Sequence, residues 1–328
     1  MHLSLYRPRA LPFLGPVCGL PGHRCGRILA VVTPLPRDRQ LRLARVLSQW
    51  RHWDCDPPLP AEPTVAAELG PGFSNSSYKV SSADGRLFTI RLDGVDPAHH
   101  GISRQAEWRA LHSAHRAGIA PRPRYFNPDL GALVYDYLAL DAEREHNTAD
   151  VARLLRSIHA LPPLHHRLDL GERTTRYRRH CTPGHRLAQA LAAIDHTIDE
   201  VLAWQRGQNN LCLCHNDLLA ANRIVSGGRL QALDWEYCAM GSPWFDLAVV
   251  CAGDELGRAG CEELLANYLL RQPAQRDWQQ LATYALLYHH IEVLWFADTS
   301  PEGVDLAAKV DQLLAAAGQV QTLGLPQG

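Results

Sequence analysis

The sequence has almost no surplus charge and very little lysine. Its 33 basic residues nearly balance its 34 acidic residues, which leaves a formal net charge of -1. A nucleic-acid-binding protein needs an excess of cationic side chains to displace the counterions of phosphate groups, so this balance argues against that class. Only two of the basic residues are lysines, Lys79 and Lys309, so a phosphate-binding lysine cannot be assumed.

Long apolar runs are also absent. No stretch of about eighteen uncharged apolar residues occurs, so the sequence predicts no membrane span. With 46% hydrophobic and 20% charged residues over 328 positions, it is typical of a globular protein of about two domains, and we expect it in the cytoplasm. Residues 1–37 contain five arginines and no acid. We interpret them as a flexible tail or as the product of a start codon assigned too far upstream, although a transit peptide has a similar charge pattern.

Cysteine spacing gives no sign of a disulfide framework. The nine cysteines are an odd number without regular spacing, and several lie in apolar runs, so we expect them to be reduced. Cys212 and Cys214 form a Cys-x-Cys pair, but no second pair accompanies them, which disfavours a zinc site. A metal protein based on cysteine and histidine is nevertheless a rival interpretation. Zinc in purified material would support it.

The order of the expected elements changes near residue 140. Before it we expect a helix that starts at 38 and ends before Pro57, several short strands and one further helix. The strands are expected over 64–69, 75–81, 87–92 and 131–138, the helix over 103–117, and a proline-containing connection over 120–124. Beyond it, helices are expected over 148–161, over 185–204 and from 243 onward, with short strands within 211–236. The sequence thus predicts an α+β fold, with a small antiparallel-sheet lobe at 38–138 and a larger, mainly helical lobe at 139–328.

Two short motifs carry the groups that phosphoryl transfer needs. Asp217 lies in the segment 215–222, and its carboxylate could orient an attacking hydroxyl and accept its proton. Asn222 and Asp234 offer hard oxygen atoms, which magnesium prefers. A loop of five residues can bring Asn222 back toward Asp217, and the Gly227-Gly228 turn returns Asp234 to the same edge. Turn-forming residues beside a buried histidine are the alternative, which the presence of both motifs disfavours.

These motifs resemble those of the aminoglycoside phosphotransferase and choline kinase superfamily, which shares the protein-kinase-like two-lobe fold. The H-x-D-x-x-x-x-N loop of that superfamily matches at His215, Asp217 and Asn222, and its metal-binding motif matches at 234–236. The continuation through 237–248 resembles the choline and thiamine kinase branch. The resemblance implies ATP and Mg²⁺ as cofactors, Asp217 as the catalytic base, and Asn222 and Asp234 as magnesium ligands. It also implies that His215 and Asp246 support the catalytic loop.

The resemblance extends to the expected nucleotide site. A loop resembling the Gly-Leu-Thr-Asn loop of this branch offers small residues and donors to phosphate: Gly72, Phe73, Ser74, Asn75 and Ser76. Arg91 occupies the strand position of the phosphate-binding lysine of protein kinases, and Glu107 in the next helix is its candidate partner. Strand alternation places Arg91 on the face opposite Ile90. Lys79 on the preceding strand is a competing candidate.

The acceptor is the least determined part of this interpretation. Aromatic faces attract cationic groups, and a carboxylate can complement their charge. The candidate contacts are Trp235, Glu236, Tyr237, Trp244 and Trp295. They favour a small alcohol such as choline, ethanolamine or thiamine, although aromatic residues at helical spacing are also typical of a core. An aminoglycoside or amino sugar is the second interpretation, and a catalytically silent kinase-fold binding protein is the third.

Overall fold

The computed structural model describes residues 37–71, 75–141, 146–299 and 303–326. The sequence analysis predicts an extension over residues 1–37. Residues 1–36 of it lie outside the described residues, and one compact unit begins at Arg37. Gly72, Phe73 and Ser74 of the expected nucleotide loop also lie outside them. The boundary that the sequence places between residues 138 and 139 stays a prediction.

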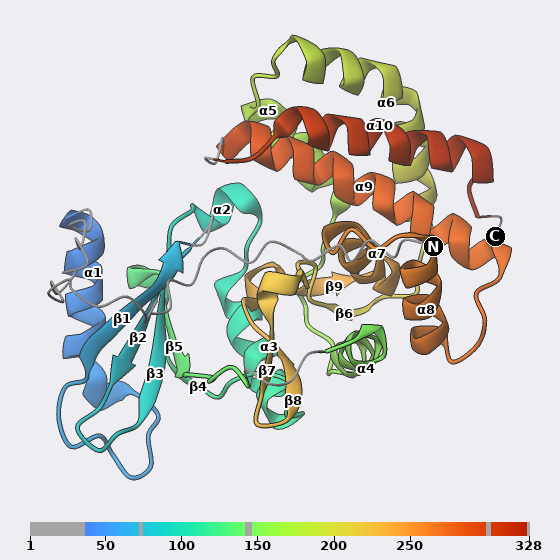
Figure 1. Ribbon diagram of the computed structural model, residues 1–328. Helices are drawn as coiled ribbons and strands as arrows, with labels where there is room; N and C mark the ends of the chain where they lie inside the picture. The colour runs from blue at the N-terminus through green and yellow to red at the C-terminus, as the bar shows by residue number, and fades with distance from the viewer. Residues whose placement is uncertain (1–36, 72–74, 142–145, 300–302, 327–328) are drawn as a thin grey trace, which may run out of the picture. The chain divides into compact units, whose positions relative to one another are not determined.

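A five-stranded antiparallel sheet forms the first part of this unit (Figure 1). Its strands, in spatial order, are β1 (Thr64–Pro71), β2 (Asn75–Ser81), β3 (Leu87–Asp93), β5 (Ala132–Asp136) and β4 (Pro123–Asn127). The sequence analysis assigned 120–124 to a connection, whereas β4 begins at Pro123. A proline is tolerated at the first residue of an edge strand because its missing N–H is not needed by the ladder.

Short helices accompany the sheet. They are α1 (Arg37–Ser48), η1 (Trp50–His52), α2 (Pro97–His100), α3 (Arg104–Arg116) and η2 (Pro128–Leu130). The first helix was expected to end before Pro57. In the structure α1 ends at Ser48, and a single turn of 3-10 helix, η1, follows it. Ser103 caps α3 by accepting a hydrogen bond from the backbone N–H of Ala106, which fixes where this helix begins.

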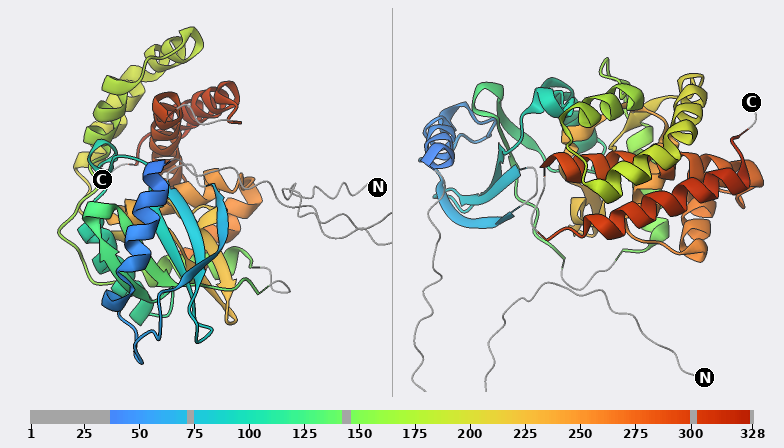
Figure 2. Two further views of the ribbon diagram at one scale, coloured as in Figure 1. Left: turned by 90° about the vertical axis from the view of Figure 1, so that its left-hand side faces the viewer. Right: turned by 90° about the horizontal axis from the view of Figure 1, so that it is seen from above.

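The rest of the unit is mainly helical. Its helices are α4 (Thr148–His159), α5 (Leu170–His180), α6 (His185–Arg206), α7 (Pro243–Gly253), α8 (Arg258–Leu269), α9 (Gln275–Thr299) and α10 (Leu306–Leu323). Helices α9 and α10 lie side by side, and α6 packs against α10 (Figure 2). The helix α5 was not expected from the sequence. The α+β prediction is confirmed, since an antiparallel sheet is followed by a helical assembly.

Two small ladders interrupt the helices and hold the loops of the candidate site. Strand β6 (Cys212–Cys214) pairs with β9 (Ala239–Gly241), and β7 (Arg223–Ser226) pairs with β8 (Arg229–Ala232). Gly227 and Gly228 join β7 to β8 with φ angles of 58° and 74°, a conformation that glycine adopts without steric cost. Single 3-10 turns, η3 (Ala220–Asn222) and η4 (Trp235–Tyr237), complete the loops.

Two further properties of the described part bear on the sequence analysis. Its seven cysteines carry free thiols. Among the described helices, none is both long and apolar enough to cross a membrane.

Candidate active site

The loop after β6 brings Asp217 and Asn222 together. The side-chain amide of Asn222 donates to the backbone oxygen of Asp217 at 2.8 Å and to its carboxylate at 2.9 Å. Burial, together with the charges of Asp234 and Glu236, raises the pKa of Asp217 well above its usual range, while the hydrogen bond from Asn222 acts in the opposite direction. Because the amide nitrogen of Asn222 faces Asp217, its oxygen points away from that carboxylate.

Asp246 anchors this loop from the first turn of α7. Its buried carboxylate accepts hydrogen bonds from the backbone N–H of His215 at 2.8 Å and of Asn216 at 2.6 Å. Asn216 has a φ of 62°, so the loop turns sharply at this position. His159 from α4 lies 3.0 Å from the same carboxylate. Asp246 therefore holds the backbone of the two residues that directly precede Asp217.

His215 occupies a structural position. Its ring is fully buried, its Nε2 lies 2.9 Å from the backbone oxygen of Leu233, and its ring packs 4.9 Å from that of Trp235. Burial lowers the pKa of His215, which favours the neutral ring that donates to the carbonyl. The histidine thus ties the loop after β6 to the turn after β8.

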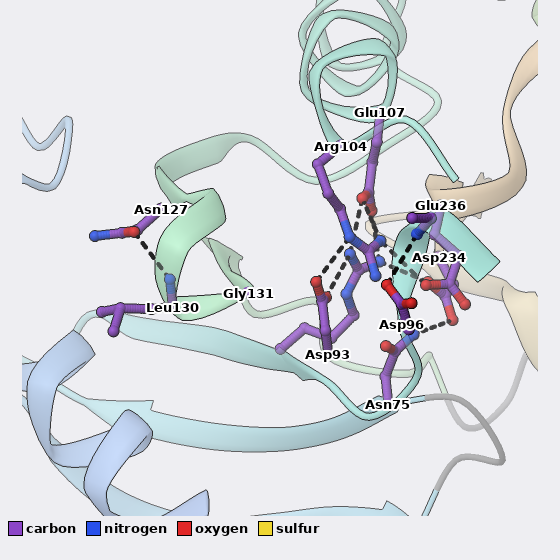
Figure 3. Close-up of polar contacts among 12 residues, drawn as sticks. Asn75, Asp93, Asp96, Arg104, Glu107, Asn127, Leu130, Gly131, Asp234 and Glu236 are labelled. Carbon is purple, nitrogen blue, oxygen red and sulfur yellow. Dashed lines mark hydrogen bonds and ion pairs between the residues drawn. The ribbon is translucent and has the colours of Figure 1, made fainter. Parts of the chain in front are cut away.

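Asp234 follows β8 in a left-handed conformation with a φ of 54°. Its carboxylate lies 3.5 Å from the amide nitrogen of Asn75 (Figure 3). The same carboxylate lies 2.7 Å from the guanidinium of Arg91. The turn after β8 therefore contacts both β2 and β3 of the larger sheet.

Arg91 and Glu107 form a buried ion pair. Two contacts of 2.5 Å and 2.8 Å join the guanidinium to the carboxylate, and Arg91 is only 2% exposed. Burial disfavours the charged guanidinium, but the charges of Glu107 and Asp234 outweigh it and raise the pKa of Arg91 well above its usual range. The competing candidate, Lys79, places its ammonium group 4.2 Å from the ring centre of Tyr137 instead.

Sequence reasoning missed a second arginine of this cluster, the partly buried Arg104. Its guanidinium lies 2.8 Å from Asp93, 2.8 Å from Glu107 and 3.1 Å from Glu236 (Figure 3). The signal that could have found it is its position three residues before Glu107, which places both side chains on the same face of α3. Arg104 and Arg91 thus share Glu107.

The oxygen atoms of this region fit a magnesium ion. Burial, with the charge of Asp234, raises the pKa of Glu236 to about 7, against the opposing charges of Arg91 and Arg104. Burial and neighbouring carboxylates thus raise the pKa values of both Asp217 and Glu236. Carboxylate oxygens and the amide oxygen of Asn222 are the donors that Mg²⁺ prefers. The donor set is consistent with a divalent cation bound by Asn222 and Asp234.

Only part of the expected nucleotide loop can be placed. Asn75 and Ser76 begin β2 and are buried, and Ser76 pairs with Leu92 in the register of β2 and β3. The amide of Asn75 faces Asp234. These two residues therefore lie at the same end of the sheet as Arg91.

The expected aromatic contacts divide into two groups. Trp235 and Trp244 are buried in the hydrophobic core, and the indole N–H of Trp235 donates to the backbone oxygen of Ala232. Their burial agrees with the alternative that these aromatic residues belong to the core, and contact with a substrate stays a prediction for both. Tyr237 and Trp295 are partly exposed, and the ring of Trp295 lies 6.5 Å from that of His100.

Arg173 on α5 is the other functional candidate that the sequence analysis missed. Its guanidinium lies 5.3 Å from the ring centre of Tyr237, and the residue is 8% exposed. Its charge opposes the rise in the pKa of Asp217. One face of Tyr237 is thus covered by a cation of the protein itself.

Comparisons with known proteins agree with this arrangement. A family model described as the phosphotransferase enzyme family (APH) matches residues 65–284. The thiamine kinase of Salmonella dublin is 25% identical over 268 residues, which cover 80% of this chain and 88% of that protein.

A shorter match involves Protein LicA of Haemophilus influenzae, which is 33% identical over 86 residues. These cover 25% of this chain and 32% of that protein, so the chain aligns with about a third of its length. The fold is similar to the solved structure of the choline kinase LicA from Streptococcus pneumoniae, with a TM-score of 0.62 and 20% identity over 79% of this chain and 95% of that chain. It is also similar to the solved structure of LicA in complex with AMP, with a TM-score of 0.64 and 20% identity over 86% of this chain and 98% of that chain.

Proposed function

The chain belongs to the phosphotransferase enzyme family, and from this premise we propose that it is an ATP-dependent kinase that phosphorylates a hydroxyl group of a small metabolite. One observation carries the proposal: Asp217 and Asn222 on the loop after β6 lie near Asp234 on the turn after β8, and Asp234 contacts the cation of Arg91. A carboxylate for the hydroxyl, oxygen ligands for a metal and a cation for phosphate are the groups this reaction needs.

Each residue then has a defined task. Asp217 orients the hydroxyl of the acceptor and takes its proton, while Asn222 donates to Asp217 and keeps that carboxylate in place. Asn222 and Asp234 would hold Mg²⁺, which supplies positive charge to the phosphates when it is bound. Arg91, fixed by Glu107, faces the nucleotide phosphates, and Asn75 and Ser76 lie at the same end of the sheet. Asp246 positions the loop that carries Asp217.

Choline, ethanolamine and thiamine are the acceptors we propose first. Support comes from the thiamine kinase that aligns with 80% of the chain and from the choline kinase with a similar fold. Acidic groups beside Asp217, above all Glu236, suit a cationic alcohol, and Tyr237 and Trp295 are the aromatic candidates that remain partly exposed. Amino sugars and aminoglycosides are the second class of acceptor.

The proposal is tested by measuring ADP release with ATP and Mg²⁺ over a panel of choline, ethanolamine, thiamine, amino sugars and aminoglycosides. We expect turnover with one class and at least a hundredfold lower kcat for Asp217→Asn, since general-base catalysis contributes about 10² to 10⁴ in rate. Nucleotide affinity of Asp217→Asn should stay within a few-fold of the original, because Asp217 is not assigned to the nucleotide.

The alternative of a silent binding protein makes a different forecast. It predicts nucleotide binding by both proteins and the same background ADP release from each across the whole panel. That result would refute the kinase proposal.

A further inference from the structure

A second cluster of potential ligands lies behind the catalytic loop. Cys212 and Cys214 are two apart on β6, so strand alternation places both thiols on one side, with Leu213 on the other. His159, the last residue of α4, approaches the same side. One ligand atom from each of these three residues lies within 4.8 Å of the others. Within the described ranges, this is the one group of three histidine, cysteine or acidic side chains with ligand atoms so close together.

The distance between the sulfur atoms matches a shared metal ion. The Sγ atoms of Cys212 and Cys214 are 3.7 Å apart. Two thiolates bound about 2.3 Å from one zinc ion at a tetrahedral angle are about 3.8 Å apart. The pair therefore has the spacing of zinc ligands without any movement of the strand.

Both ring nitrogens of His159 have polar partners. Its Nε2 lies 3.0 Å from the carboxylate of Asp246, and its Nδ1 lies 2.8 Å from the hydroxyl of Tyr268. Zinc-binding histidines commonly keep one ring nitrogen on a carboxylate or another polar partner while the other nitrogen binds the ion. One of the two nitrogens of His159 can exchange its partner for a metal, and the other keeps the ring in place.

We propose that His159, Cys212 and Cys214 form a zinc site with three protein ligands. Thiolate and imidazole select zinc, whereas the oxygen atoms near Asp217 suit magnesium, so the two sites differ in the metal they bind. Cys212 is partly exposed and gives the ion a route from solvent to the buried Cys214. In the sequence, the Cys-x-Cys pair has no third ligand nearby, because residue 159 is far from it. In the fold, His159 supplies this third ligand.

The site would act on the kinase through its neighbours. Cys214 directly precedes His215, and Asp246 contacts both His159 and the backbone of His215. A bound zinc ion would join α4 and β6 and hold the start of the catalytic loop. The zinc site does not depend on the proposed activity, because its ligands take no part in phosphoryl transfer.

The test uses the full chain, reduced, stripped with a chelator and then equilibrated with an equimolar amount of Zn²⁺ in the presence of excess Mg²⁺. After gel filtration, elemental analysis should find about one zinc per chain. Cys212→Ser is the test variant, since its partly exposed side chain can be changed without opening the core. Cys55→Ser is the matched control, because Cys55 is equally partly exposed and lies outside the cluster.

We expect Cys55→Ser to retain zinc and Cys212→Ser to lose most of it while its circular dichroism spectrum is unchanged. Co²⁺ provides a second measurement on the unmodified chain, because two thiolate ligands give charge-transfer absorption together with the intense visible bands of a tetrahedral ion. Equal zinc retention by Cys212→Ser and the unmodified chain would overturn the proposal. So would the absence of both retained zinc and the thiolate–cobalt bands in the unmodified chain. Neither readout involves kinase turnover, so failure of the kinase assay leaves this test intact.

Discussion

The guanidinium of Arg91 lies 2.7 Å from the carboxylate of Asp234, so strand β3 and the turn after β8 meet at an ion pair. Arg91 lies 2.5 Å from Glu107 at the same time. A proposed magnesium ligand and a helix carboxylate thus share one buried cation. Nucleotide phosphates that reach Arg91 would compete with Asp234 for it, and a magnesium ion would free Asp234 from that pairing.

Replacing Arg91 should damage both stability and activity. Arg91→Ala leaves Glu107 buried without its closest cation, and breaking a buried ion pair costs about 3 to 5 kcal/mol. Arg91→Lys keeps the charge but loses the forked contact, so we expect a smaller loss of stability and a roughly tenfold or larger rise in KM for ATP. Urea unfolding and ADP-release kinetics measure the two effects.

Arg86→Ala is the matched control on the same strand-turn-strand unit. Arg86 pairs with Asp84 on the surface, and surface pairs contribute little to stability. If Arg91→Ala were no less stable than Arg86→Ala, the buried pair would not have the importance assigned to it.

Arg104 should be coupled energetically to Glu236. Arg104→Gln leaves Glu236, which is 2% exposed, without its guanidinium partner, so we expect a loss of about 2 to 4 kcal/mol. Adding Glu236→Gln removes the stranded carboxylate and should recover part of this loss. Denaturant unfolding of the two single variants and the double variant gives a coupling energy of about 1 to 3 kcal/mol. Strictly additive effects would contradict a direct interaction.

Asp246 should control the rate through the catalytic loop. Asp246→Asn replaces one carboxylate oxygen by an amide nitrogen, which cannot accept a hydrogen bond from the backbone N–H of His215 or Asn216. A buried donor left without an acceptor costs about 1 to 3 kcal/mol. We expect a lower kcat with little change in KM for ATP. Ser242→Ala is the control, because Ser242 caps the same helix without touching the loop. It should cost about 1 kcal/mol and leave kcat unchanged.

Acid should destabilise the fold partly through His100. Burial, then the charge of His99, lowers the pKa of His100 to about 4, with Arg173 acting in the same direction and Asp298 and Asp96 opposing. The unfolded chain has a histidine pKa of about 6.5, so it binds the proton first as pH falls. The stability that the neutral ring contributes is therefore present above about pH 6.5 and is lost between about pH 6.5 and 4.

We expect His100→Gln to reduce the fall in unfolding free energy over this pH range by up to about 3 kcal/mol, measured by urea unfolding at several pH values. His196→Gln is the control, because the His196 side chain is 88% exposed. Parallel pH profiles for the original chain and His100→Gln would show that His100 does not cause the loss.

The candidate site residues could be picked out from the sequence because they lie in short, contiguous motifs. The spacing between His215 and Asn222 and the strand position of Arg91 are local properties, and the structure brings Arg91 to Glu107. The fold class followed from strands that precede long helices. The roles of these residues in catalysis stay predictions.

The missing parts have a physical explanation. Helix α5 buries Leu170, Arg173, Thr174 and Tyr177, which have helical spacing but include a cation, so the apolar stripe was hidden. Arg104 was overlooked because two of its three carboxylate partners, Asp93 and Glu236, come from β3 and η4, and a contact between separate elements has no local pattern. Burial of Trp235 and Trp244 likewise depends on helices that pack over them.

The arginine at position 91 also decides how this chain would behave toward reagents that identify kinases by their chemistry. Acyl-phosphate nucleotide probes tag an enzyme by acylating a lysine amine beside the bound phosphates. A guanidinium remains protonated at neutral pH and is not a nucleophile. The two amines of the lysine side chains lie elsewhere, over the ring of Tyr137 and beside Glu292. If the nucleotide phosphates bind at Arg91 as proposed, a lysine-directed label carried by a nucleotide would find no amine at that position.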